Sequence, residues 1–394
     1  MWRDEGGNVA ILTALSAGLL GAAAGFGVEV GYWHLLQARL QQAADAAAYA
    51  GAVDLRTGVG ADPQASALAA ATANRFDPAK GGIDTVWPSI TFPSDPNSVD
   101  VSLSRSEPRV FTALFIDEPV LIRVHATASF QTAGKACVLA LDPSASRAAQ
   151  FSGNSNTKLV GCVVSANSLA ADAVRVQGSA QLSTPCIYSS GGVELTTGAH
   201  LDCAAAKVGQ ALTPDPYRNL TVPSPTGPCT GNSSNIQPGR CFSNLQLNKG
   251  VTHFPPGNYF ISGGSMTVNA NASITGTGVT FFFINNASVD LRGGAQVDLA
   301  APTSGPYSGM LLVGARTNTD VENKINGDAS SRLTGAIYFP KQRVTYNGNF
   351  SGDNGCVQVV AKTVEWSGST TVKVDCSAYG MGVIETGGAA KLVR

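Results

Sequence analysis

The chain has 394 residues, with 27 acidic and 26 basic side chains, and only 13% of it is charged, against roughly 25% in a usual soluble domain. A net charge of -1 without a run of Lys or Arg excludes a nucleic-acid-binding protein, because such a protein needs basic side chains to neutralise phosphates. Hydrophobic residues make up 44% of the chain, enough for a real core, and 44 glycines with 20 prolines indicate many turns.

The first predicted element is a membrane-spanning helix at residues 9–30, after a short cytoplasmic tail of residues 1–8. Residues 9–28 contain no charged side chain, and about 20 residues of helix span a ~30 Å hydrocarbon core. A cleaved signal peptide is the alternative, with residues 22–24 as its cleavage site. The tail lacks the net positive charge typical of signal peptides. We therefore expect a retained anchor, with cleavage and secretion as the alternative.

Small side chains recur at every fourth position of this span, a spacing that permits close approach of a second helix. The positions predicted to pack in this way are Ala14, Ala17, Gly18, Gly21 and Gly25. Gly and Ala are also common in membrane helices that do not associate, so the stripe alone leaves both interpretations open.

Residues 31–55 are rich in Ala, Leu and Gln and are expected to continue the helix beyond the membrane. Tyr32 and Trp33 fall where aromatic residues gather at a membrane surface. An apolar stripe on this extension needs a cover, either from another protein or from the chain's own next domain. The stripe consists of Leu36, Leu40, Ala43, Ala47 and Ala50.

The first 55 residues carry several short motifs in order. Gly7-Asn8-Val9-Ala10 opens the apolar run, Glu29 and Gly31-Tyr32 close it, and LQQAADAAAYAGA follows from Leu40. This order resembles the N-terminal anchor of TadE/TadG-like Flp pilus-assembly proteins. The resemblance implies a single-pass inner-membrane protein with a periplasmic bulk, which takes part in assembly of the tight-adherence pilus with other pilus-assembly proteins.

The anchor departs from pilin-type members of that system. Those proteins carry a glutamate shortly after a cleavage site, and their apolar run follows it. Here Glu29 follows the apolar run. Processing of this chain as a pilin is therefore not expected.

Residues 56–135 predict a small α+β unit beside the membrane. The Ala-rich stretch at residues 63–76 favours a short helix. Apolar residues occupy every second position of 99–103 and 120–126, as in strands with one buried face.

Residues 136–394 predict a right-handed parallel β-helix, a solenoid of stacked coils, so the fold class is mainly β. A nine-residue hydrophobic pattern recurs without gaps, and neighbouring copies start 19 residues apart (174 to 193) or 23 apart (266 to 289). That distance is the length of one coil of a three-faced solenoid, and coils stack because none buries its inward face alone. Residues 257–307 also resemble β-helical regions attached to TadE/TadG-like anchors. The Pro-rich residues 213–240 predict a loop projecting from the solenoid.

The cysteines indicate disulfides and an oxidising compartment, because they are even in number and all follow residue 136. Several of their spacings approach one coil length, and stacked coils bring equivalent positions within ~4.8 Å, close enough for a disulfide. Zinc is the alternative, although the chain has no C-x-x-C or paired-histidine spacing. The expected pairs are Cys137 with Cys162, Cys186 with Cys203, Cys229 with Cys241, and Cys356 with Cys376.

One motif suggests a metal site. Asp142, Ser144 and Ser146 form D-x-S-x-S, the first element of a von Willebrand A metal site, a domain that some TadG-like proteins carry. Strand repeats rather than alternating helices follow it here. Because Asp and Ser favour local bonds to the backbone, we expect a turn capped by these side chains. No metal and no cofactor is expected.

Two aspartates occupy equivalent positions of the repeat, Asp202 and Asp298, with Asp290 and Arg292 near the second. Carboxylates gathered on one solenoid face would favour an enzyme that degrades polysaccharides or a glycan-binding surface, whereas an outward aspartate at a coil corner is usually only solvated. We predict a non-catalytic, membrane-anchored envelope protein with a structural or adhesive role in pilus assembly. A carbohydrate-binding or polysaccharide-degrading β-helix is the first alternative, and a secreted binding protein is the second.

Overall fold

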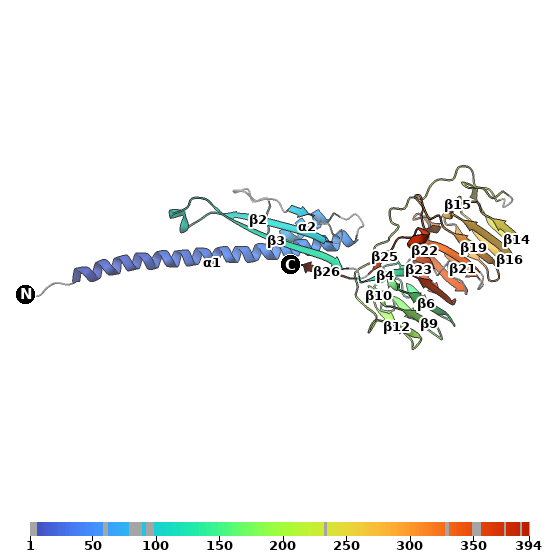
Figure 1. The fold of residues 1–394 in the computed structure, drawn as a ribbon, viewed down its shortest axis with the longest axis horizontal. Helices are drawn as coiled ribbons and strands as arrows, with labels where there is room; N and C mark the ends of the chain where they lie inside the picture. Colours follow the sequence, from blue (N-terminus) through green and yellow to red (C-terminus); the bar gives the residue numbers. More distant parts are fainter. Residues whose placement is uncertain are drawn as a thin grey trace, which may run out of the picture. The chain divides into compact units, whose positions relative to one another are not determined.

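The computed structural model describes residues 6–57, 62–78, 89–91, 98–131, 133–231, 235–327, 331–348, 356–373, 376–386 and 388–393. The chain divides into two compact units, one made of Met1–Gln131 with Ala389–Arg394 and the other of Thr132–Gly388. The fold is mainly β, with 44% strand, a long N-terminal helix and a solenoid of about nine coils (Figure 1). The fold class predicted from the sequence is confirmed.

The first unit is built on one continuous helix, α1 (Gly6–Thr57), which contains both the expected span and its extension. The most apolar stretch of α1 has a mean hydropathy of 1.8 and is only 6% buried, so it is not part of the core of its own unit. By length and composition this stretch can cross a membrane, a criterion that a signal sequence near the N-terminus also meets.

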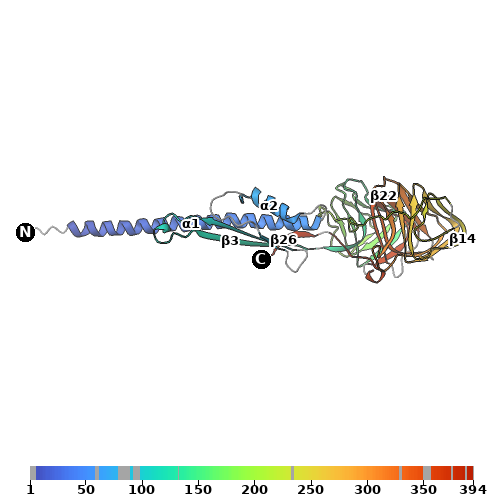
Figure 2. The ribbon, with the colours of Figure 1, turned by 90° about the horizontal axis from the view of Figure 1, so that it is seen from above.

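An antiparallel sheet and a short helix lie against the C-terminal half of α1 (Figure 2). Asp62 caps the N-terminus of helix α2 (Pro63–Ala73), and its carboxylate accepts the Ala65 backbone N–H at 2.9 Å. Four residues of the predicted apolar stripe of α1 pack in the core with this sheet and α2, namely Leu36, Leu40, Ala43 and Ala47, so the cover of the stripe comes from the chain's own domain. Ala50 is only partly buried and lies outside that core. The sheet has the order β1 (Ser89–Thr91), β2 (Ser98–Glu107), β3 (Val120–Gln131), β26 (Ala389–Val393).

The last strand, β26, belongs to the first unit. It pairs antiparallel with β3, with Ala389 opposite Gln131, and Ala390 enters the core beneath the sheet. The predicted extent of the solenoid, 136–394, is therefore too long at its C-terminal end. Without residues 389–393 this edge of β3 would have no paired strand, and pairing with β26 covers it. The solenoid is thus inserted between two paired strands.

The second unit begins in the middle of its own stack of coils. Its first strands run outward to one end of the stack, and their bounds are β4 (Gly134–Ala140), β5 (Ala149–Phe151), β6 (Asn156–Val160), β7 (Val163–Ala166), β8 (Val174–Val176), β9 (Gln181–Thr184), β10 (Ile187–Ser189), β11 (Val193–Glu194) and β12 (Ala199–Leu201). The remaining strands start at the opposite end and return to the middle, as the colours of Figure 1 show. They are β13 (Cys241–Phe242), β14 (Leu245–His253), β15 (Gly257–Ser262), β16 (Ser265–Thr277), β17 (Val279–Ile284), β18 (Ser288–Leu291), β19 (Gln296–Ala300), β20 (Met310–Gly314), β21 (Glu322–Gly327), β22 (Arg332–Gly348), β23 (Val357–Trp366) and β24 (Thr370–Lys373).

The two halves of the solenoid meet where β23 pairs in parallel with β4, at Val360 opposite Leu139. An aromatic ladder crosses this junction inside the core. The Trp366 ring stacks on Tyr346 at 4.1 Å between centroids and lies 6.3 Å from Phe151 on the other half. A short strand, β25 (Ile384–Thr386), then pairs antiparallel with β4, so the chain leaves the solenoid beside the point where it begins.

The predicted repeat corresponds to the register between coils. Val174 lies opposite Val193, and Met266 lies opposite Val289, as the aligned copies of the repeat require. Each match places one apolar side chain directly above its equivalent in the next coil, and the stacked side chains form the continuous core.

The Pro-rich residues 213–240 lie along the solenoid instead of projecting from it. We call residues 203–240 the return segment, because they connect β12 at one end of the stack to β13 at the other; residues 232–234 lie outside the described part. Thr213 bonds to Ser165 at 2.8 Å between hydroxyl oxygens, and the Tyr217 hydroxyl donates to Gln358 at 2.7 Å. The prediction of a projecting loop was wrong because the two ends of the solenoid must be joined across its length.

Four disulfides are present, and all eight cysteines pair as predicted from the sequence. Three of them connect neighbouring coils or their connecting turns, and the fourth ties the return segment to the first residue of β13. The pairs and their Cα–Cα distances are Cys137–Cys162 at 5.6 Å, Cys186–Cys203 at 5.4 Å, Cys229–Cys241 at 4.4 Å and Cys356–Cys376 at 5.4 Å.

Candidate functional sites on the anchor and the solenoid

The hairpin between β2 and β3 is fixed to α1 by a buried carboxylate. Glu29 of α1 accepts the backbone N–H of Val110 at 2.5 Å and that of Thr112 at 2.8 Å, one on each carboxylate oxygen. Thr112 begins a short 3-10 helix, η1 (Thr112–Leu114). The carboxylate therefore satisfies backbone donors that the first turn of this helix leaves unpaired. We call residues 108–119 the hairpin tip.

The hairpin tip also contacts α1 one turn before Glu29. A Cβ atom placed on Gly25 would come within 2.7 Å of the Phe111 ring, so this glycine is what allows the ring to lie on the helix. Gly25 was predicted to pack against a second helix, and in the structure its contact is with its own hairpin. The other predicted packing positions, Ala14, Ala17, Gly18 and Gly21, are exposed, and their association with another helix stays a prediction.

The base of the hairpin tip is polar. The Arg109 guanidinium lies over the Trp33 ring, 5.4 Å from its centroid, and its Nε donates to the Glu118 carbonyl at 2.7 Å. Tyr32 beside it is exposed. Both aromatic residues predicted to mark the membrane surface thus lie at the level of this polar base.

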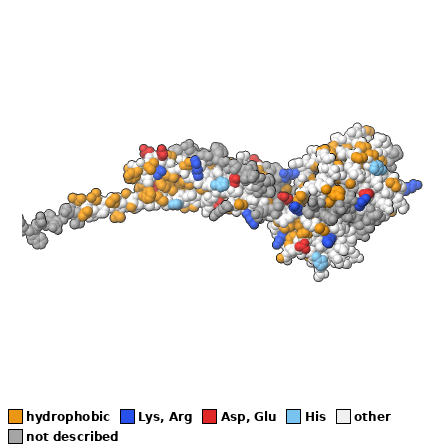
Figure 3. Space-filling view, viewed as in Figure 1, with side chains coloured by type: hydrophobic (Ala, Val, Ile, Leu, Met, Phe, Trp, Pro, Cys, Tyr) orange, Lys and Arg blue, Asp and Glu red, His pale blue; other side chains and the backbone are white. Residues whose placement is uncertain are grey.

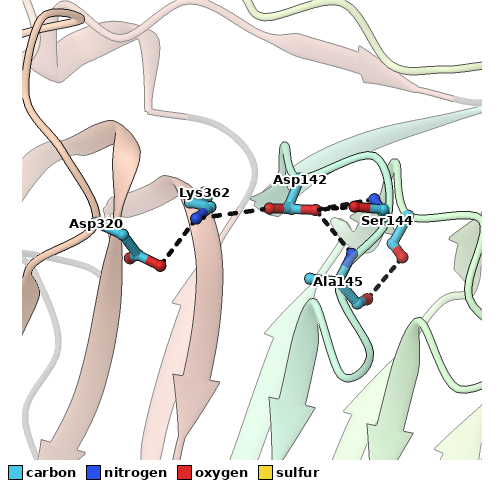
Figure 4. Close-up of polar contacts among 6 residues, drawn as sticks. Asp142, Ser144, Ala145, Asp320 and Lys362 are labelled. Atoms are coloured by element: carbon cyan, nitrogen blue, oxygen red, sulfur yellow. Dashed lines mark hydrogen bonds and ion pairs between the residues drawn. The ribbon is translucent and has the colours of Figure 1, made fainter.

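A polar groove of about 500 Å³ lies on the solenoid where its two halves meet. Lys362 on β23 is central to it: its Nζ lies 2.8 Å from Asp320 Oδ2 and 3.9 Å from Asp142 Oδ2 (Figure 4). The charged side chains of the groove come from four neighbouring coils and balance in sign; they are Asp142, Arg147, Asp320, Arg343, Lys362 and Glu365.

The D-x-S-x-S motif forms a turn at the edge of this groove. Asp142 Oδ1 accepts the backbone N–H of Ser144 at 2.8 Å and that of Ala145 at 2.7 Å (Figure 4). The Ser146 hydroxyl donates to Asp172 at 2.7 Å and thereby lowers the pKa of that carboxyl group. The motif thus supplies local backbone bonds, as its turn interpretation predicts.

The equivalent aspartates of the repeat do not form one cluster. Asp298 on β19 pairs with Arg332 at 2.6 Å in the large sheet, whereas Asp202 follows β12 in a separate four-stranded sheet. Asp290 pairs with Arg292 at 3.0 Å. Sequence equivalence did not place Asp202 near Asp298 because the chain restarts its stacking from the far end between them.

A second polar cluster fixes the return segment to the solenoid. Asp215 lies 2.8 Å from the Arg316 guanidinium, and the Tyr338 hydroxyl donates to the same carboxylate oxygen at 2.8 Å. Burial and the charge of Asp215 raise the pKa of both Tyr338 and Tyr217. Sequence reasoning missed this cluster, because Asp215 lies 101 residues from Arg316 and 123 residues from Tyr338 in the sequence.

These features define a protein with an apolar N-terminal helix, a helix-and-sheet unit built on that helix, and an inserted β-solenoid. Residues 7–54 match the family model described as putative Flp pilus-assembly TadE/G-like. The chain therefore carries a TadE/G-like domain over α1, which supports a membrane anchor and a connection to pilus assembly. No curated protein and no solved structure matches the chain.

Proposed function

We propose that the protein is a membrane-anchored envelope component of Flp pilus assembly, with a structural or adhesive role and no catalytic one. The observation that carries the proposal is the TadE/G-like match, which falls on a helix apolar enough to cross a membrane. Its direct partners are other pilus-assembly proteins of the envelope.

The proposed localisation is the inner membrane, with a single crossing and the solenoid in the periplasm or outside the cell. All four disulfides lie in the second unit, and disulfides persist in oxidising compartments. This placement leaves the N-terminal end of α1 on the cytoplasmic side. Protease added to spheroplasts should degrade the solenoid, whereas a solenoid protected until the cells are lysed would contradict this topology.

A non-catalytic role is supported by how three of the aspartates singled out in the sequence are engaged. Asp142 caps a turn, and Asp290 and Asp298 each pair with an arginine. A general acid or base needs a carboxyl group that is free to exchange a proton with its substrate. We propose that these groups stabilise coil corners.

Deletion of the gene in its host tests the proposed function. Surface pili counted by electron microscopy should disappear and return on re-expression of the full chain. Normal pilus counts in the deletion strain would contradict a role in assembly.

Glycan binding in the polar groove is a second candidate function. The observation that favours it is the row of carboxylates, guanidinium groups and a lysine across four coils, since such groups form hydrogen bonds with sugar hydroxyls. A glycan array probed with the full chain should show ligands that Lys362→Met weakens. Lys324→Met is the matched control, because Lys324 lies on β21 outside the groove lining and pairs with Glu322. Equal binding by the two variants, or no binding by the full chain, would contradict glycan binding in the polar groove.

A further inference from the structure

We propose that the hairpin tip inserts its apolar residues into the surface of the same membrane that α1 crosses, as a second contact with lipid. The proposal rests on the anchor role proposed for α1. The partner proposed for the exposed apolar side chains of the tip is the lipid bilayer itself. The inference depends on where the tip contacts α1 along the length of that helix.

The hairpin tip exposes large apolar side chains next to one another. Leu114 is 87% exposed, Phe115 is 82% exposed and Val110 is 70% exposed, and Phe111 and Ile116 are about half exposed. Hydrophobic surface covers this end of the hairpin and the adjacent part of α1 (Figure 3). Soluble surfaces rarely leave so many large apolar side chains together without a partner.

The contacts of the hairpin tip set its depth. Phe111 lies on Gly25, and Val110 and Thr112 bond to Glu29, so the tip is level with the last turn of the apolar run at residues 9–28. A helix rises about 1.5 Å per residue, which places Gly25 roughly 4.5 Å inside the end of that run. If the run fills the hydrocarbon core, the exposed side chains around Phe111 face lipid.

The polar groups at this level are arranged as an insertion requires. An ionised carboxylate near hydrocarbon is costly, and Glu29 is buried and accepts two backbone N–H groups instead of facing lipid. The turn of η1 forms a local backbone hydrogen bond, from the Phe115 N–H to the Thr112 carbonyl. Fewer backbone polar groups of the tip would therefore face lipid without a partner. Charged side chains begin at the base of the tip, with Arg109 over Trp33 and with Asp117 and Glu118 after Ile116.

Continuity with the α1 span favours lipid over a protein as the occupant. The apolar surface of the tip meets the span where Phe111 lies on Gly25, and residues 17–28 of the span contain no polar side chain. Large apolar side chains of both the tip and the span are exposed. An apolar loop held beside a membrane-spanning helix gains its burial from the bilayer without any further component.

The test uses the full chain reconstituted into vesicles of phosphatidylethanolamine and phosphatidylglycerol. The natural cysteines are all in disulfides among the described residues, so Leu114→Cys can be labelled alone with an environment-sensitive fluorophore. Ser102→Cys is the matched control: it is exposed on β2 of the same hairpin, roughly 20 Å before the tip begins at residue 108, at about 3.3 Å per residue.

We expect the Leu114→Cys label to be quenched at least several-fold more by lipids with a spin label in their acyl chains than the Ser102→Cys label, and to be shielded from aqueous iodide. Equal iodide access at both positions would overturn the proposal. Shielding from iodide without quenching by spin-labelled lipid would also overturn it, because a second copy of the chain would then cover the tip. Resistance of the vesicle-bound protein to alkaline extraction reports on α1 separately, so failure of the anchor and failure of the tip are distinguishable.

Discussion

The Glu29 carboxylate accepts the backbone N–H of Thr112 at 2.8 Å across 83 residues of sequence. With the bond to Val110, this contact joins the end of the apolar run of α1 to the far end of the β2–β3 hairpin. The sheet is therefore fastened to the helix at two levels, by its apolar core near the C-terminal half of α1 and by this carboxylate at the end of the apolar run.

Glu29→Gln should loosen the hairpin tip without unfolding the unit. The amide would turn one donor toward a backbone N–H, and hydrogen bonds to a charged acceptor contribute about 1.5–3 kcal/mol. Amide hydrogen exchange at residues 110 and 112 should accelerate roughly tenfold or more. Exchange in β3 should stay as slow as in the natural protein. Unchanged exchange at both tip amides would contradict the conclusion that the Glu29 carboxylate holds the hairpin tip on α1.

Gly25→Leu should displace Phe111, because a Cβ at this position lies within 2.7 Å of the ring. Gly21→Leu is the matched control, since nothing lies within 4 Å of a Cβ placed there. Limited proteolysis of the hairpin tip should rise in the first variant alone. If Gly21→Leu instead changes the oligomeric state measured by crosslinking in membranes, the small-residue stripe packs against a second helix at that point.

Local periodicity explains which parts of this fold can be read from the sequence. Helix α1 follows from its apolar run and its Ala-rich extension, and the register of Val174 with Val193 and the disulfide Cys137–Cys162 follow from spacings of about one coil. The order in which the coils stack cannot be read from the sequence in this way. Each copy of the repeat would look the same whichever equivalent coil lay next to it. Nothing in the sequence near residue 241 signals that stacking restarts at the opposite end.

The functional surfaces were only partly predictable for a similar reason. The turn at Asp142 is a local motif and was predictable, whereas the groove around Lys362 draws on residues from four coils. The hairpin tip had a signal that went unused: residues 110–116, between Pro108 and Pro119, are apolar except for Thr112. The Glu29 contact that sets its depth depends on packing and has no local signature.

Asp215→Asn should lower the stability of the solenoid by about 1–3 kcal/mol, because it weakens an ion pair and a hydrogen bond that hold the return segment. Asp298→Asn removes an ion pair with Arg332 that is about half exposed, and such surface pairs contribute about 0–1 kcal/mol. The midpoint of denaturant unfolding should fall clearly in the first variant and little in the second. Equal shifts would mean that the return segment is not fixed at Asp215.

Alkaline pH should destabilise the solenoid through its buried tyrosines. Burial raises the pKa of Tyr259 to about 12, and burial also raises the pKa of Tyr346. The unfolded tyrosine ionises near pH 10, so the stabilisation is complete below that pH and is lost as the pH rises towards 12. The ultraviolet titration of tyrosinate should show a late group that Tyr259→Phe reduces. Ionisation of all nine tyrosines near pH 10 in the folded protein would contradict this account.

The most direct test of the account as a whole separates the anchor from the solenoid. Because Gln131 and Ala389 lie opposite each other in an antiparallel pair, replacing residues 132–388 with Asn-Gly should close a two-residue hairpin and keep the first unit folded. In the deletion strain, the account predicts that this variant reaches the membrane but does not restore the surface pili that the full chain restores. Pilus counts equal to those with the full chain would contradict a part for the solenoid in assembly.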